Sequence, residues 1–229
     1  MFNRLKFFVA DKLIKNDFDE IICPVIKNKP RWWETLRARQ TVRSCPAFSF
    51  LLKDSFLIKL PCDVLVEKKD GNVFIYSLNE LWMNIDNHDL SVQFSESHAK
   101  SFLNIKFMLQ ATVCAKKPVK GVQLTAFNYT DENEELFRAV EGSFPIIETS
   151  TQLNINTFFR ISELNKRCES FSEGTNILLK KGTPLCLLYF PEGLPKYDVE
   201  VGSILTNLTM HKLTSLKEGM AHLFHRAFN

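Results

Sequence analysis

The chain has 229 residues, of which 45% are hydrophobic, and it contains 20 phenylalanines but only 4 tyrosines. This apolar content is enough for a sizeable buried core, and it excludes a chain that is disordered over most of its length. The formal net charge of +3 is too small to indicate nucleic acid as the partner of the whole protein. Because phenylalanine has no polar group, we expect most of these rings in a core or in a contact between subunits.

The six cysteines show no C-x-x-C spacing and several lie in apolar runs, as the reduced thiols of a cytosol-like compartment do. The apolar run at residues 7–10 is too short for a signal peptide and ends at the charged Asp11 and Lys12. No stretch approaches the roughly 18 uncharged apolar residues of a transmembrane helix. We therefore expect a protein without a membrane segment that works in the cytoplasm or in an assembly built there.

Residues 5–10 fit either a short strand or the first turn of a helix, because the run is too short for its periodicity to decide. Between residues 27 and 43, six cations accompany a single acid, Glu34, and two adjacent tryptophans. Cations neutralise phosphates while aromatic rings stack on bases, so this run is a candidate site for nucleic acid or another partner. In the alternative interpretation, the tryptophans anchor an N-terminal arm, residues 1–43, on the core and its charges are solvated. The candidate residues are Arg31, Trp32, Trp33, Arg37, Arg39 and Arg43.

The β domain is expected to span residues 44–195 and to begin at the Cys45-Pro46 turn, which leads through two apolar runs to a second turn at Pro61-Cys62. Asp70 and Gly71 between two apolar runs predict a tight β-hairpin.

Period-two alternation predicts further strands in residues 103–113, 122–130 and 152–161, and two apolar runs around residues 180–184 predict two more. Many short strands separated by turn signals at intervals of about ten residues indicate a mainly β fold, either a sandwich or a barrel.

In the last segment, residues 196–229, the apolar residues between 205 and 228 recur at spacings of three and four, which predict an amphipathic helix, although Gly219 weakens the pattern. Such a helix must bury its apolar stripe against its own core or against a neighbouring subunit. The candidate interface residues are Leu213, Leu216, Met220, Leu223, Phe224 and Phe228.

No residue pattern indicates catalysis. The sequence contains neither of the glycine-rich phosphate-binding motifs and no G-x-S-x-G nucleophile motif. His222 and His225 have a spacing that metal ligands also use, but no cysteine completes a site and only Glu218 is near. We therefore predict no catalytic residue, no metal site and no cofactor, and we expect binding rather than chemistry.

Four segments together resemble an uncharacterised family of tailed-bacteriophage proteins associated with T4-like marine phages. The resemblance covers about residues 20–195 and is one of order and spacing. It implies a phage protein that acts in the host cytoplasm or in the virion, as an assembly component or accessory factor. Its partners are then other phage proteins or further copies of the chain, with nucleic acid as a third candidate. The segments are Pro30-Arg31-Trp32-Trp33, Cys45-Pro46-Ala47-Phe48, Leu60-Pro61-Cys62-Asp63-Val64 and Lys181-Gly182-Thr183-Pro184-Leu185.

The chain is also distantly similar to the β-clip fold of the trimeric dUTPases and dCTP deaminases, which implies a β-clip-like barrel. Residues 140–155 then correspond to the glycine turn and the strand that carries the catalytic acid, and residues 180–189 to the strand that closes the site. The chain departs from that pattern because Ser143, Phe144 and Pro145 follow Gly142, and Glu148 is the nearest carboxylate. The alternative function is thus a divergent dUTPase-like protein that binds or hydrolyses nucleotides.

Overall fold

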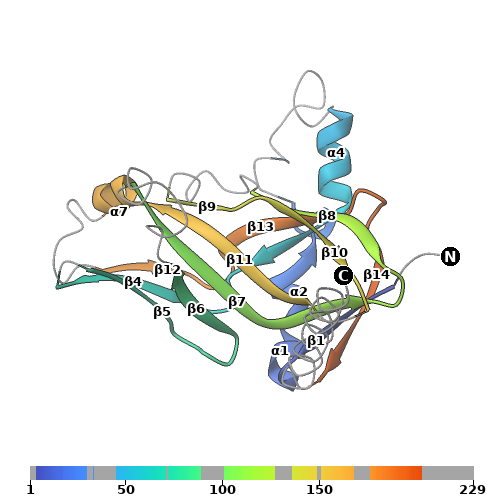
Figure 1. Ribbon diagram of the computed structural model, residues 1–229, viewed down its shortest axis with the longest axis horizontal. Helices are drawn as coiled ribbons and strands as arrows, with labels where there is room; N and C mark the ends of the chain where they lie inside the picture. The colour runs from blue at the N-terminus through green and yellow to red at the C-terminus, as the bar shows by residue number, and fades with distance from the viewer. Residues whose placement is uncertain are drawn as a thin grey trace, which may run out of the picture.

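The computed structural model describes residues 4–29, 33, 45–70, 72–88, 101–126, 136–148, 151–167 and 176–202. Within these ranges the chain is mainly β, as the sequence predicted, and its strands form three sheets (Figure 1). None of the three sheets closes into a barrel, so the described strands fit a sandwich-like class and do not form the expected β-clip-like barrel.

Sheet A contains six strands: β1 (Arg4–Val9), β6 (Met83–His88), β7 (Phe102–Ala115), β9 (Phe137–Ala139), β11 (Thr151–Arg160) and β14 (Lys196–Val201). Their order is β14-β1-β7-β11-β9, and β6 also pairs with β7. The long β7 forms the middle of the sheet because one end of it pairs with β6 and the other with β1. β7 and β11 confirm the strands expected in residues 103–113 and 152–161.

Sheet B contains β2 (Ile22–Pro24), β3 (Ser55–Lys59), β8 (Val119–Thr125), β10 (Gly142–Ile146) and β13 (Pro184–Tyr189), in the order β10-β8-β13-β3-β2. Sheet C contains β4 (Val64–Lys69), β5 (Asn72–Ser77) and β12 (Asn176–Leu179), in the order β12-β4-β5. The helices are short: α1 (Lys12–Asn16), α2 (Phe18–Ile21), the 3-10 helix η1 (Val25–Lys27), α4 (Pro46–Lys53) and α7 (Ile161–Arg167).

One hydrophobic core holds the three sheets together. Alternation along β1 turns Leu5, Phe7 and Val9 inward, where each is fully buried. Phe7 of sheet A meets Phe56 of sheet B edge to face, with ring centroids 5.8 Å apart. Each Å² of apolar surface that is removed from water stabilises the fold by roughly 25 cal/mol. These large buried rings therefore contribute much of the stability of the sandwich. Ile75 contributes the inner face of sheet C to the same core.

The first stretch of the expected β domain is a helix. Residues 46–53 form α4, although the sequence indicated a turn and strand at this point. Pro46 stands at the start of the helix, where its missing N–H leaves no hydrogen bond unmade. The apolar residues of this run do not distinguish a strand from a helical turn, and that is why the pattern misled. The strand expected after it begins only at Ser55.

The hairpin between β4 and β5 is confirmed. Lys69 pairs with Asn72 across a two-residue loop, and Asp70 has a φ of 51°, the left-handed conformation that such a loop requires. By contrast, the parallel pairing of β1 with β14 was not predicted. It joins the two ends of the described chain and is flanked by an ion pair of 2.8 Å between Lys6 and Glu200.

No helix in the described part of the chain is long and apolar enough to cross a membrane. The amphipathic helix expected in residues 205–228 lies outside the described residues.

Candidate interaction surface

The outer face of sheet C presents large apolar side chains to water. Along β5, Val73 and Ile75 pack on the core, whereas Phe74 and Tyr76 point to the other side of the sheet. Phe74 is 36% exposed and Tyr76 42% exposed. Their rings are stacked, with centroids 6.2 Å apart and an interplanar angle of 9°. Two adjacent aromatic rings in water are a feature of contact surfaces rather than of an ordinary solvated strand.

The strand register extends this apolar surface across the sheet. Leu65 of β4 lies opposite Tyr76 on one side and opposite Leu178 of β12 on the other. Leu178 is 40% exposed, and Leu78, which directly follows β5, is 57% exposed. We call Leu65, Phe74, Tyr76, Leu78 and Leu178 the sheet C patch.

The patch borders an open edge of the sheet. β5 is the last strand of sheet C, and no other strand in the described ranges pairs with its second edge. The N–H of Leu78 donates to the carbonyl of Asp63 at 3.0 Å, so residues with even numbers hydrogen-bond toward β4. Residues of an antiparallel strand alternate in direction, so Val73, Ile75 and Ser77 direct their N–H and C=O groups to the open edge.

A turn contact fixes the base of the patch. One carboxylate oxygen of Asp63 accepts the backbone N–H of Lys181 at 2.6 Å, and the other lies 3.4 Å from Nζ of Lys180. The backbone hydrogen bond from Lys181 is the main reason why the pKa of Asp63 is lowered. Gly182 follows with a φ of 86°, a conformation that favours glycine. The contact holds β12, and with it Leu178, in register with β4.

The side chain of Lys181 ties the same turn to α2. Its Nζ lies 3.2 Å from Oδ2 of Asp17 and 3.6 Å from Oε2 of Glu20, and 5.6 Å from the centre of the Trp82 ring. The hydrogen bond to Asp17 is the main reason why the pKa of Lys181 is raised. These pairs are exposed and each adds little to stability, so their role is to position the turn.

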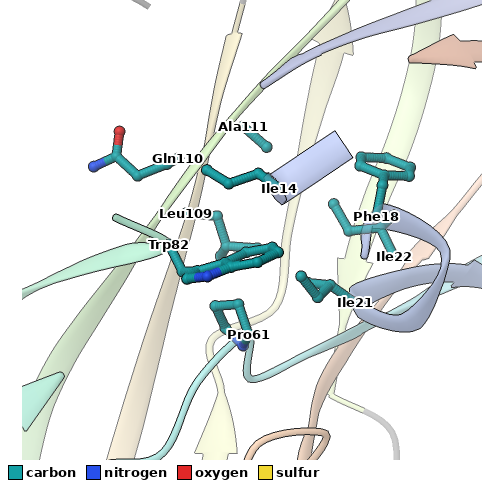
Figure 2. Close-up of a pocket in the computed structure, with 9 residues that line it drawn as sticks. All are labelled: Ile14, Phe18, Ile21, Ile22, Pro61, Trp82, Leu109, Gln110 and Ala111. Atoms are coloured by element: carbon teal, nitrogen blue, oxygen red, sulfur yellow. The ribbon is translucent and has the colours of Figure 1, made fainter. Parts of the chain in front are cut away.

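A small apolar pocket lies beneath Trp82, next to this turn. Figure 2 shows the indole ring between Leu109 and Pro61, while the amide of Gln110 points away from the other side chains. The wall of this pocket presents no polar group that could orient a ligand, so we interpret the pocket as a small packing gap in the core. It is lined by Ile14, Phe18, Ile21, Ile22, Pro61, Trp82, Leu109, Gln110 and Ala111.

Trp33 is the only candidate of the basic arm within the described residues. It is 8% exposed and packs in a small cluster with Cys23, Val25 and Leu52. Its ring stacks on Phe48 of α4, with centroids 5.6 Å apart. That contact is the one expected of a tryptophan that anchors the arm. Arg31, Trp32, Arg37, Arg39 and Arg43 lie outside the described residues, as do the six candidate residues of the C-terminal helix, so their roles stay predictions.

The segments that resemble the dUTPase site lie in sheet B. Gly142 begins β10, which pairs with β8, and β8 pairs in turn with β13. Leu124 of β8 therefore separates Gly142 from Leu188, and Glu148 is exposed beyond the end of β10. In the part of the chain that the structure describes, no group of three or more His, Cys, Asp or Glu residues could hold a metal ion.

Sequence reasoning did not single out Phe74 and Tyr76. All four residues from Val73 to Tyr76 are apolar, so alternation within β5 could not show which face is exposed. The hairpin register contained part of the missing signal, because it places Glu67 opposite Phe74 but Val66 opposite Ile75. A charged residue on the neighbouring strand favours the solvent face, but Lys68 opposite the inward Val73 shows that charge alone does not decide it.

The chain matches no known family model, no curated protein and no solved structure.

Proposed function

We propose that the chain is a non-enzymatic bacteriophage protein that binds other proteins through the sheet C patch. It acts as a virion or assembly component, or as an accessory factor, in the host cytoplasm or in the particle. The observation that carries the proposal is the exposed aromatic pair of Phe74 and Tyr76 within a continuous apolar surface.

The composition of the patch favours a protein partner. Protein contact surfaces are enriched in aromatic side chains at their centre and depleted of charge, with charged residues at the rim. The patch has this arrangement, since Glu67, Lys69 and Lys180 lie at its borders and its centre is Leu65 and Tyr76. A phosphate-bearing partner would instead require several cations at the centre.

Two of the four segments on which the phage resemblance rests meet beside the patch. Gly182 donates its N–H to the carbonyl of Leu60, and Leu60 donates its own N–H to the carbonyl of Thr183, both at 2.8 Å. The shared order and spacing therefore fall on turns that hold the patch in place, which supports a common binding role.

The test is incorporation into particles. Wild-type chain should be found by mass spectrometry in purified phage particles, or bound to a defined phage protein in infected cells. Replacing Phe74 and Tyr76 together by lysine should reduce that association at least tenfold, because two aromatic anchors of an interface are removed.

Phe50→Lys is the matched control, because Phe50 is 56% exposed on α4, which projects away from sheet C in Figure 1. It should leave the association unchanged. Absence of the wild-type chain from particles and from every phage-protein complex would refute the proposal, and so would an equal loss in both variants.

A further inference from the structure

We infer that the C-terminal segment, residues 205–228, forms a helix that packs its apolar stripe on α1 and β14 of its own chain. The occupant of this surface is therefore part of the same molecule, and the stripe is not left free for a neighbouring subunit. The surface is separate from the sheet C patch, so the inference goes beyond the proposed function.

The described chain ends beside exposed apolar side chains. Gly202 donates its N–H to the carbonyl of Val9 at 3.0 Å, so the chain leaves sheet A at the end of β1. The residue before it, Val201, is 43% exposed. α1 begins three residues after Val9 and lies against β14 (Figure 1), and its Leu13 is 63% exposed. The point where residues 203–229 begin thus adjoins two apolar side chains in water.

The same apolar surface continues along β14. Pairing with β1 places Tyr197, Val199 and Val201 on the face of sheet A that carries the core residues of β1. Tyr197 and Val199 pack only partly against that core, and no other described strand pairs with the second edge of β14. Proteins commonly cover such an open edge with a helix or a loop. We call Leu13, Tyr197, Val199 and Val201 the β14 edge cluster.

The C-terminal sequence supplies an occupant of matching chemistry and sufficient length. A helix with an apolar stripe is stable in water only when that stripe is buried. The stripe from Leu213 to Phe228 would be about 22 Å long, enough to cover β14 as well as α1. The ten residues between Gly202 and Leu213 reach at most roughly 35 Å, which is ample for the chain to turn back onto the β14 edge cluster.

A second copy of the chain competes poorly for this surface. A tether of about ten residues holds the helix near its own chain at an effective concentration in the millimolar range. Helices of other chains at micromolar concentration are about a thousandfold less available. The stripe therefore packs within one chain, and the chain stays monomeric as far as this contact is concerned.

Methyl-resolved nuclear Overhauser spectroscopy of the full chain tests the inference. We expect cross-peaks from the methyl groups of Leu13 and Val201 to those of Leu216 and Leu223. Leu81 is the matched control, because it has the same exposed fraction as Leu13, 63%, but follows β5 in the chain. Its methyl groups should show no cross-peak to the stripe.

Amide hydrogen exchange provides a second measurement. Residues 213–228 should be protected in the wild type, and Leu13→Lys with Val201→Lys should speed their exchange at least tenfold, because the two exposed contacts of the stripe are lost. Leu81→Lys should leave this exchange unchanged. Exchange at the amides of β7 should be the same in all three proteins, which shows that the sandwich still folds.

Rapid exchange of residues 213–228 in the wild type would overturn the inference, and so would protection that survives the two lysine substitutions. Protection that falls on dilution, together with a dimer in sedimentation velocity, would place the helix on a second copy and would also overturn it. No residue of the sheet C patch takes part in this contact, so the test of particle incorporation succeeds or fails independently of these results.

Discussion

Replacing Trp33 by alanine should destabilise the protein without acting on a binding site. Trp33 is 8% exposed, and its ring stacks on Phe48. Removing a buried tryptophan costs about 3–5 kcal/mol, through lost burial and the cavity that remains. The free energy of unfolding of a domain is about 5–15 kcal/mol, so the loss is between about a fifth and the whole of the stability. Because the free energy of unfolding falls by about 1–3 kcal/mol per M of urea, the urea midpoint should fall by roughly 1–5 M.

The assay is urea unfolding monitored by far-ultraviolet circular dichroism, which reports the backbone and does not depend on tryptophan fluorescence. Trp33→Phe is the matched control. Phenylalanine keeps a ring against Phe48, so its midpoint should fall by much less. Retention on DNA and RNA should be the same for all three proteins under conditions where each is folded. An unchanged midpoint combined with lost nucleic-acid retention would refute the packing role and favour the binding interpretation of the arm.

Three further outcomes follow from single contacts. Asp63→Asn removes the negative charge that accepts the Lys181 N–H. The pKa of Asp63 in the folded protein is below its ordinary value of 3.8, so above pH 3.8 the wild type should be more stable than the variant. In urea titrations, this difference should vanish as the pH falls through the pKa of Asp63 in the folded protein. Thr157→Val should lower the unfolding free energy by about 1 kcal/mol, because the buried hydroxyl donates to a backbone carbonyl of β7 at 2.9 Å; an unchanged value would contradict this. In peptide mapping after thiol alkylation, the exposed Cys45 should react in the folded protein. Cys186 is fully buried, and this burial raises its pKa, so it should react only when the protein unfolds. Equal reaction rates for the two thiols would contradict the burial of Cys186.

Local signals predicted the local elements of the fold. The Asp70-Gly71 hairpin follows from turn chemistry, and β7 and β11 follow from period-two alternation. The pairing of β1 with β14 joins residues that are 192 positions apart in the chain, such as Arg4 and Lys196. No local period records which distant strand becomes a neighbour, so this pairing could not be predicted from the sequence.

The candidate surface needed the register as well as the pattern. Phe74 and Tyr76 look like core residues in the sequence, and only their place on the face of β5 that points away from the core exposes them to water. Trp33 shows the reverse case, because a tryptophan between cations suggests a binding site, yet its ring lies in a packed cluster. In both cases, packing between elements decides exposure, and composition alone does not report it.

The central claim is that the chain contacts its partners through β5. Residue-resolved amide hydrogen exchange tests it most directly, because Phe74 and Tyr76 donate toward β4 whereas Val73, Ile75 and Ser77 donate toward the open edge. We predict that binding of a protein partner slows exchange at the three outward amides, while exchange at the two inward amides stays unchanged. Association accompanied by unchanged exchange at Val73, Ile75 and Ser77 would contradict the claim and place the contact elsewhere.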